Sequence, residues 1–437
     1  MANLIQIRCH PDRAPYNPVL MENPTLAHHL ALNAARHPDA PGLIYGAESL
    51  SLGVLLAALR QTSASRFRRT APVLAVGARR HLFEQTLLAS LAERPFWPQE
   101  RATPLAISPL PECALMLSTS GTEGRPKVVQ LGLSALNQAA RAANERLPIG
   151  PGDVWLHCLP LIHIGGQMIL WRCYMAGAGI CLTAQFNASE IAHCLARHPV
   201  SHLSLVPAML AKLLDAGVRP PASLRHVLIG GAALHAALFA RAQAAGWPLH
   251  PSYGMSETAA QIASWTPHDG PWQPGLAGRP LPGVEIRRNP EGRIEIRGTQ
   301  RMLGYLGEAR LPDDAWFTTG DTGYLDEAGC LHIQGRADDI LISGGRNIHP
   351  QEIEDALSHH AGIRDIAVTA LPDPVWGDSL MALFVGDSNP AQLAEYGARH
   401  LPPPLRPRRY LQLDSLPRNS AGKLMRIQLK QLAADNA

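Results

Sequence analysis

Two spacings of hydrophobic residues alternate along much of the chain. Segments rich in Ala and Leu repeat at the helical spacing, and the short apolar runs between them have the length of buried strands. The pattern predicts helices over 26–37, 52–65, 82–91, 166–175, 188–197 and 207–214, and strands over 73–77, 155–159, 203–206 and 226–229. Strands that alternate with helices in this way predict a layered α/β architecture.

The pattern changes near residue 284, where short strand-like runs replace the helices. The runs 285–287 and 293–296 flank turn residues at 289–292, which predicts a hairpin. A second hairpin is predicted over 321–334, with its turn at 326–329. Beyond Gly335 helix and strand patterns mix again, which indicates a small α+β domain at the end of the chain.

Composition excludes several classes of protein. With 437 residues, 46% hydrophobic and 17% charged, the chain can bury large cores and is unlike a disordered protein. Its formal net charge of +3 gives no basic field for nucleic acid. No apolar run reaches the roughly 18 residues of a membrane helix, and the N-terminus lacks the apolar core of a signal peptide, so a cytoplasmic location is expected. The seven cysteines never occur as CxxC, which favours reduced thiols over a structural zinc site.

The first candidate for chemistry is the segment 113–130, which predicts a strand, a flexible loop and a second strand. Its loop, 117–127, concentrates hydroxyls and glycines and ends at Lys127, so it could surround the oxygens of a polyphosphate. It is not a Walker A loop, because Pro126 precedes Lys127 and no Ser or Thr follows. Taken alone, the composition fits a plain mobile loop equally well.

Five segments together are more specific than this loop. They are 117–127, 252–258, 319–321, 335–339 and 417–423. Their order and spacing resemble the adenylate-forming superfamily of acyl-CoA synthetases, adenylation domains and luciferases. The resemblance implies that a carboxylate attacks the α-phosphate of ATP to give an acyl-adenylate and pyrophosphate, after which a thiol attacks the activated carbonyl. ATP, Mg²⁺ and CoA are the cofactors and co-substrates that it implies.

The resemblance also assigns roles to single residues. Lys423 matches the catalytic lysine that stabilises charge at the α-phosphate, Thr258 would face that phosphate, and His163 would line the acyl or thioester channel. Glu257 matches the carboxylate that holds Mg²⁺. The alternatives are a solvated lysine on a polar turn for Lys423 and a satisfied buried histidine for His163.

The nucleotide and its thiol partner would contact a wider set of residues. Tyr253 would stack on adenine, Asp321 would accept hydrogen bonds from both ribose hydroxyls, and Arg336 would assist at the ribose or phosphates. The full set implied for cofactor binding is Ser118, Thr119, Ser120, Gly121, Thr122, Lys127, Gly231, Ala232, Tyr253, Gly254, Asp321, Arg336 and Gly344. Without the other motifs, the Gly-Gly pair and the Thr-Gly-Asp sequence would be ordinary turns.

The implied fold class is α/β, with a large N-terminal layered domain that includes a β-rich subdomain and a small mobile α+β C-terminal domain. The boundary is expected at 1–337 and 338–437, with Asp338 as the hinge between the two catalytic steps. Rotation about this hinge would withdraw Lys423 and bring Gly344 near the thiol arm. A plain charged turn is the alternative for Asp338.

Two further segments, 159–167 and 204–214, look like those of the o-succinylbenzoate-CoA ligases of menaquinone biosynthesis. Substrate contacts would then come from His163, Lys212 and Gly254. The subgroup usually has arginine where Lys212 stands, and lysine keeps the charge but loses the bidentate fork for a second carboxylate. The alternative is that Lys212 belongs to the polar face of helix 207–214.

We therefore expect an ATP-dependent acid-CoA ligase, with 2-succinylbenzoate as the leading substrate. A stand-alone adenylation enzyme that loads an aryl or acyl group onto a carrier protein in secondary metabolism shares all the motifs and is the alternative. A nucleotide-binding protein without activity is disfavoured by the intact Lys423, Glu257 and Asp321. The expected partners are a small carboxylic acid and CoA or a phosphopantetheinyl carrier protein, with a homodimer left open and no nucleic acid or membrane span.

Overall fold

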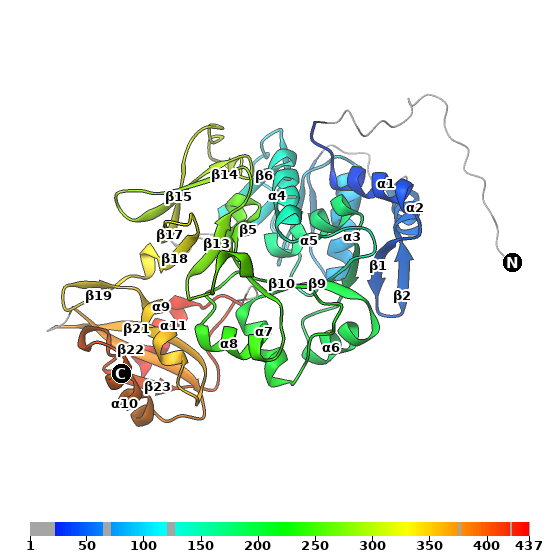
Figure 1. The fold of residues 1–437 in the computed structure, drawn as a ribbon. Helices are drawn as coiled ribbons and strands as arrows, with labels where there is room; N and C mark the ends of the chain where they lie inside the picture. Colours follow the sequence, from blue (N-terminus) through cyan, green and yellow to red (C-terminus); the bar gives the residue numbers. More distant parts are fainter. Residues whose placement is uncertain (1–21, 64–70, 120–126, 375–376, 420–421, 437) are drawn as a thin grey trace, which may run out of the picture.

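The computed structural model describes residues 22–63, 71–119, 127–374, 377–419 and 422–436. Its architecture is α/β, with a large N-terminal part and a smaller C-terminal part (Figure 1). The N-terminal part contains two sheets whose strands are linked by helices, and the C-terminal part has a sheet of its own. The predicted fold class is therefore confirmed.

The centre of the largest sheet is parallel and fully buried. Its strands are β8 (Gly179–Leu182), β7 (Val154–His157), β9 (Val200–Leu205), β10 (His226–Ile229) and the first half of β11 (Leu249–Met255). Every residue of β7, β8 and β9 is buried, as is typical of strands covered on both faces. Helices α6 (Ala188–Arg197), α7 (Pro207–Asp215) and α8 (Ala236–Ala244) lie in the connections between successive strands.

Strand β11 joins this parallel centre to the β-rich subdomain. Residues 249–251 pair in parallel with β10, and residues 252–255 pair antiparallel with β12 (Ala260–Ser264). Beyond β12 the sheet continues through β13 (Leu276–Pro280), β18 (Leu331–Arg336), β17 (Phe317–Leu325), β15 (Arg293–Gly298) and β14 (Val284–Arg288). Both predicted hairpins, β14–β15 and β17–β18, are confirmed.

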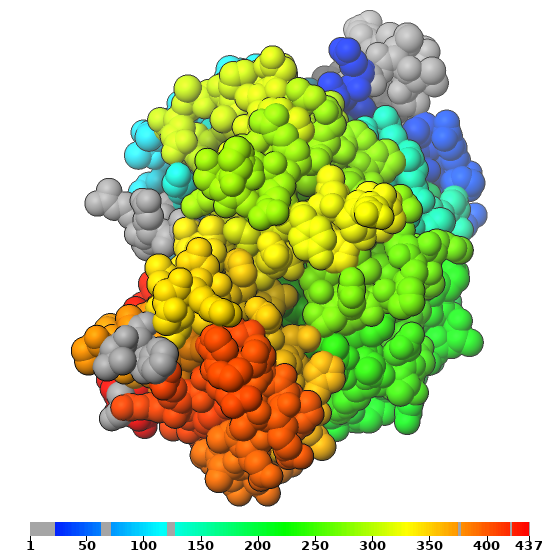
Figure 2. Space-filling view, turned by 60° about the vertical axis from the view of Figure 1, so that its left-hand side comes forward, coloured from blue at the N-terminus to red at the C-terminus, as the bar shows by residue number. Residues whose placement is uncertain are grey.

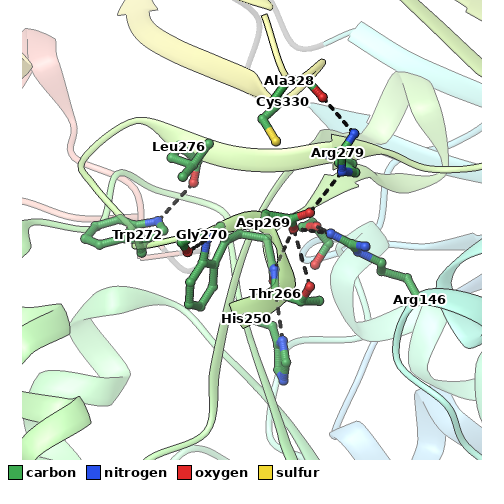
Figure 3. Close-up of polar contacts among 12 residues, drawn as sticks. Arg146, His250, Thr266, Asp269, Gly270, Trp272, Leu276, Arg279, Ala328 and Cys330 are labelled. Atoms are coloured by element: carbon green, nitrogen blue, oxygen red, sulfur yellow. Dashed lines mark hydrogen bonds and ion pairs between the residues drawn. The ribbon is translucent and has the colours of Figure 1, made fainter. Parts of the chain in front are cut away.

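Asp269 connects the β-rich subdomain to the helix that carries Arg146 (Figure 3). It ends the 3₁₀ turn η3 (Pro267–Asp269), and its side chain is only 1% exposed. Its carboxylate accepts from the Thr266 backbone at 2.9 Å and pairs with Arg146 of α4 (Leu133–Arg146) and, at 3.2 Å, with Arg279 of β13. Because two arginines from separate elements meet one buried carboxylate, the connection between β12 and β13 is fixed.

The second N-terminal sheet consists of five strands in the order β16 (Gly304–Tyr305), β6 (Lys127–Gly132), β5 (Cys113–Thr119), β4 (Phe96–Pro98) and β3 (Val73–Ala75). Helices α1 (Leu26–Arg36), α2 (Leu52–Ser63), α3 (Arg79–Leu91) and α5 (Ile164–Ala176) pack around it and share one hydrophobic core. Two strands at the edge of the large sheet, β1 (Pro41–Tyr45) and β2 (Glu48–Ser51), were not predicted.

The C-terminal part folds around the strand order β20 (Arg346–Ile348), β19 (Leu341–Ser343), β22 (Gly377–Gly386) and β21 (Ile363–Asp373), with β23 (Arg409–Gln412) beside β22. Its helices are α9 (Pro350–Ser358), α10 (Pro390–His400) and α11 (Arg426–Asp435). Helix α9 contacts α8 and β18 of the N-terminal part. Figure 2 shows the orange and red surface of the C-terminal residues directly adjoining the green surface of the N-terminal part.

Candidate active site

Tyr253, Asp321 and Arg336 form one polar group at the edge of the β-rich subdomain. Tyr253 lies in the second half of β11, and its hydroxyl donates to Asp321 Oδ2 at 2.6 Å. Asp321 and Arg336 face each other across the β17–β18 hairpin, with Nη1 of Arg336 at 3.6 Å from Oδ1 of Asp321. Burial and the neighbouring Asp321 carboxylate raise the pKa of the Tyr253 phenol well above its ordinary value, so the hydroxyl keeps the proton that it donates.

Two glycines, Gly230 and Gly231, directly follow the end of β10. Gly231 has φ +82°, a conformation that residues with a Cβ rarely adopt, and a Cβ built there would lie 3.3 Å from Cγ1 of Val206, just after β9. These two strand ends lie at the carboxyl edge of the parallel sheet, where open α/β sheets bind ligands. Ala232 follows Gly231 and is half-buried.

Gly254 has a structural reason to be glycine that is independent of any ligand. A Cβ at this position would lie 1.9 Å from the backbone oxygen of Ala260 on the paired strand β12. The sequence-based expectation that Gly254 contacts nucleotide or substrate stays a prediction, because the β11–β12 pairing already requires the absence of a side chain.

A second polar group surrounds Glu257. The hydroxyl of Tyr305 in β16 donates to Glu257 Oε1 at 3.0 Å. The Lys127 ammonium lies 4.6 Å from the centre of the Tyr305 ring and 3.7 Å from Oε1 of Glu308. Burial and then Glu257 raise the pKa of Tyr305, while the positive charge of Arg336 acts in the opposite sense. Glu257 lies in the 3₁₀ turn η2 (Ser256–Thr258), which directly follows β11, the strand of Tyr253, so one short stretch of chain carries a residue of each polar group.

The phosphate-loop residues are described only at the two ends of the loop. Ser118 and Thr119 end β5, and Thr119 is paired in register with Lys127 at the start of β6. The Ser118 hydroxyl accepts from the Trp97 indole at 3.3 Å. Ser120, Gly121 and Thr122, which were predicted to contact phosphate, lie outside the described residues.

Thr258 is fully buried, and its hydroxyl is engaged within its own turn. It accepts from the Met255 backbone at 3.2 Å and donates to the Ala260 oxygen at 2.9 Å. The following residues, Ala259 and Ala260, have φ values of +50° and +85°. Positive φ is costly for residues with a Cβ and is often found at functional sites, so this turn holds a strained backbone beside Glu257.

A short hairpin in the C-terminal part carries Lys423. Arg418 and Leu424 form an antiparallel bridge, and the Lys423 backbone donates to Asn419 Oδ1 at 3.0 Å. Gly422 precedes Lys423 at φ +76°, and a Cβ at Gly422 would lie 2.7 Å from Cγ2 of Val206. The hairpin is therefore packed against the carboxyl end of β9, on the residue that also limits the space at Gly231.

His163 lies at the start of α5, as the N-cap residue of that helix. Burial lowers the pKa of His163, and the Lys423 ammonium lowers it further, whereas Glu100 acts in the opposite sense. Two residues from distant segments, both predicted to be catalytic, are thus close enough to interact electrostatically. Because the imidazole is buried beside a cation, it is held in the neutral form.

Three predicted residues remain to be placed: Lys212, Asp338 and Gly344. Lys212 is exposed on α7, with Leu210 and Leu213 buried beside it, and no ion pair of Lys212 occurs within the described ranges. Asp338 lies in the 3₁₀ turn η4 (Ala337–Asp339), 3.6 Å from Arg336 and 4.0 Å from Arg293.

The last of these residues, Gly344, has φ +57° and forms with Gly345, at φ +72°, the two-residue turn between β19 and β20. Positive φ at both central positions is the requirement of a type I′ hairpin turn, which explains the glycine pair.

Metal, membrane and disulfide features can be stated for the described residues. Among them, no helix is long and apolar enough to cross a membrane, and no three His, Cys, Asp or Glu side chains gather as a metal site. The described cysteines are all free thiols. Glu257 still fits Mg²⁺, because this ion keeps several waters and is usually held by one or two carboxylates together with substrate phosphates.

Comparisons with known proteins identify relatives of the whole chain. Residues 53–306 match the family model of AMP-binding enzymes, and residues 352–423 match that of the AMP-binding enzyme C-terminal domain. The chain is 34% identical over 332 residues to the 2-succinylbenzoate–CoA ligase of Bacillus subtilis (strain 168). The aligned region covers 72% of this chain and 68% of that enzyme.

Two solved structures of o-succinylbenzoate CoA synthetase from Bacillus subtilis differ in how well they superpose. The complex with the acyl-adenylate intermediate OSB-AMP gives a TM-score of 0.82 at 28% identity, covering 94% of this chain and 99% of that one. A double mutant bound with its product analogue OSB-NCoA gives 0.65 at the same identity, covering 92% and 97%. The matched family models, the sequence identity and the shared fold lead to one conclusion: the chain belongs to the family of AMP-binding enzymes.

Proposed function

We propose that the protein is an ATP-dependent 2-succinylbenzoate–CoA ligase, which forms an acyl-adenylate and then a thioester, as expected for menaquinone biosynthesis. One observation carries the proposal: the Lys423 hairpin is seated at the carboxyl end of β9, against Val206, the residue on which Gly231 also packs. The 34% identity to the Bacillus subtilis ligase supports the choice of acid, and its name supports CoA as the acceptor.

In the first step the residues of this chain would stabilise charge at the α-phosphate. Attack by the substrate carboxylate increases negative charge on the phosphate oxygens, and a fixed ammonium group at that point lowers the barrier. Lys423 is the cation that the hairpin delivers there. His163, neutral at physiological pH, adds no competing positive charge and can line the path of the acid.

Tyr253 and Asp321 would hold the adenosine end of ATP. The Tyr253 hydroxyl fixes Oδ2 of Asp321, and Arg336 lies 3.6 Å from Oδ1, so the carboxylate is held in place to accept from a ribose hydroxyl. The open backbone at Gly231 would let a flat base approach closely. Glu257 would hold Mg²⁺, which when bound would neutralise part of the phosphate charge.

The second step would follow a rotation of the C-terminal domain about Asp338, with the domain boundary at 337/338. The better superposition on the OSB-AMP complex than on the OSB-NCoA complex supports the proposal of two arrangements, the first of which would correspond to this structure. Gly344 near the thiol arm, the cytoplasmic location and a homodimer stay predictions.

The proposal is tested by pyrophosphate release from ATP and Mg²⁺ with a panel of acids, namely 2-succinylbenzoate, benzoates and fatty acids, each with and without CoA. Among these acids, we expect pyrophosphate release only with 2-succinylbenzoate, and we expect this acid to be converted to a thioester when CoA is present. Turnover of a different acid would contradict the substrate. Release that proceeds to a thioester only with a holo carrier protein would contradict the acceptor and favour a stand-alone adenylation enzyme.

A further inference from the structure

Helix α8 of the N-terminal part has no capping side chain of its own. Its N-cap residue is His235, whose side chain makes no hydrogen bond to the first turn. The first backbone N–H groups of a helix have no partner within it, and Ser, Thr, Asp or Asn at the N-cap usually supplies one. The start of α8 is half-buried, so another group must take this place.

That group comes from the C-terminal part. Asp355 of α9 accepts the backbone N–H of Ala236, the first residue of α8, with Oδ1 at 3.0 Å. The same oxygen lies 3.9 Å from Nδ1 of His235. A carboxylate at a helix N-terminus is also stabilised by the helix dipole. Asp355 therefore caps α8 across the junction of the two parts.

We propose that Asp355 is a positioning residue that holds the C-terminal domain in the arrangement in which Lys423 reaches the active site. The proposal rests on the two-step function above. The contact at the other end of the junction, Gly422 on Val206, is apolar and cannot fix an orientation by hydrogen bonding. Asp355 supplies a directional contact away from the hinge, and it must be broken before the domain rotates for thioester formation.

The consequence for kinetics is specific. The docked arrangement is the one in which Asp355 contacts α8, and the undocked arrangement is the one after rotation. If the rate of each half-reaction is proportional to the population of its own arrangement, the rate of thioester formation divided by the rate of adenylation is proportional to the undocked-to-docked population ratio. Loss of a helix cap changes such an equilibrium about two- to thirtyfold. Asp355→Ala should therefore raise this ratio of half-reaction rates by about tenfold, whether or not the docked state dominates in the unmodified protein.

The experiment measures both half-reactions in single turnover: pyrophosphate release with 2-succinylbenzoate and ATP, and thioester formation from supplied 2-succinylbenzoyl-adenylate and CoA. Asp355→Asn, which keeps an acceptor oxygen but loses the charge, should give an intermediate ratio. Asp387→Ala is the matched control, because this aspartate of the same domain is 91% exposed and only loosely paired with Arg364, at 3.8 Å. It should leave the ratio unchanged.

A readout without substrate separates this proposal from the proposed function. Amide hydrogen exchange of Ala236 should be several-fold faster in Asp355→Ala, because the N–H loses its acceptor. An unchanged ratio, an equal fall of both rates, or unchanged exchange at Ala236 would overturn the positioning role. If the unmodified protein releases no pyrophosphate with any acid, the proposed function fails, and the exchange measurement alone decides whether Asp355 caps α8.

Discussion

Acidification from about pH 7.5 to about pH 5 should remove a large part of the folding stability, because stacked histidines are buried in the neutral form. Trp155, His202, His226 and His250 lie on the neighbouring strands β7, β9, β10 and β11, with ring centroids 4.9, 4.9 and 5.0 Å apart. Burial and then the adjacent His226 lower the pKa of His202 to about 3 and that of His250 to about 4. The Asp153 carboxylate acts to raise the pKa of His202 and the Arg225 guanidinium acts to lower it, each less than burial does.

The sign and size follow from the difference between folded and unfolded protein. An unfolded histidine has a pKa of about 6.5, so below that pH the unfolded chain binds protons that the folded chain does not. Well above pH 6.5 these histidines cause no loss of folding stability. As the pH falls from there toward the pKa values of the folded protein, the folding stability decreases. At pH 5 each of these histidines costs about 2 kcal/mol, or about 4 kcal/mol for the pair, against a typical total of about 5–15 kcal/mol.

The assay is urea unfolding, followed by tryptophan fluorescence, at several pH values between about 5 and about 7.5. His202→Phe keeps a ring between Trp155 and His226 but cannot bind a proton. Between pH 5 and 6 its free energy of unfolding should therefore depend less steeply on pH, by up to about 1.4 kcal/mol per pH unit. The exposed His268, changed to Phe, is the control and should keep the original dependence. Identical pH dependence in His202→Phe and the unmodified protein would refute the reasoning.

Four substitutions test other parts of the structure. Lys423→Ala should reduce acid-dependent pyrophosphate release at least about 100-fold and spare much of the thioester step from supplied adenylate; an equal loss of both would contradict its role. Tyr253→Phe removes the hydrogen bond to Asp321 and should raise the KM for ATP about fivefold, with little change in kcat. Lys212→Ala should raise the KM selectively for an aryl acid with a second carboxylate, and unchanged kinetics would leave Lys212 a surface residue. Asp269→Ala, which removes the buried partner of two partly exposed arginines, should lower the free energy of unfolding by about 1.5–3 kcal/mol, measured by urea unfolding.

The fold was predicted best where burial leaves a simple mark on the sequence. Helix 188–197 and strand 226–229 were predicted with the bounds that the structure gives, because the helix has a clear apolar face and the strand is a short apolar run. Helix α3 begins at Arg79 rather than at 82, since the charged first turn hides the helical spacing. Strands β1 and β2 were missed because they are short and partly exposed, and because their pairing is with distant or neighbouring strands: β1 pairs with β8, and β2 pairs with β1.

The candidate site was predicted from motifs, and the structure adds what motifs cannot contain. Tyr305 meets Glu257 only because β16 pairs with β6, and no local pattern marks that tyrosine. Val206 is an ordinary apolar residue in the sequence, yet both Gly231 and Gly422 are packed against it. The proximity of Lys423 to His163 likewise depends on how the two parts of the chain pack, which residue spacing does not encode.

Strand β11 limits how far relatives of this chain can differ in length. Its first residues continue the parallel sheet and its last residues start the antiparallel one, so a single strand sets the register of both. An insertion or deletion of one residue between Leu249 and Tyr253 would turn the later side chains of this strand to the opposite face. Tyr253 would then point away from Asp321, and the place of Gly254 beside Ala260 would fall to a residue with a Cβ. Length changes should therefore accumulate in the surrounding loops and spare this strand.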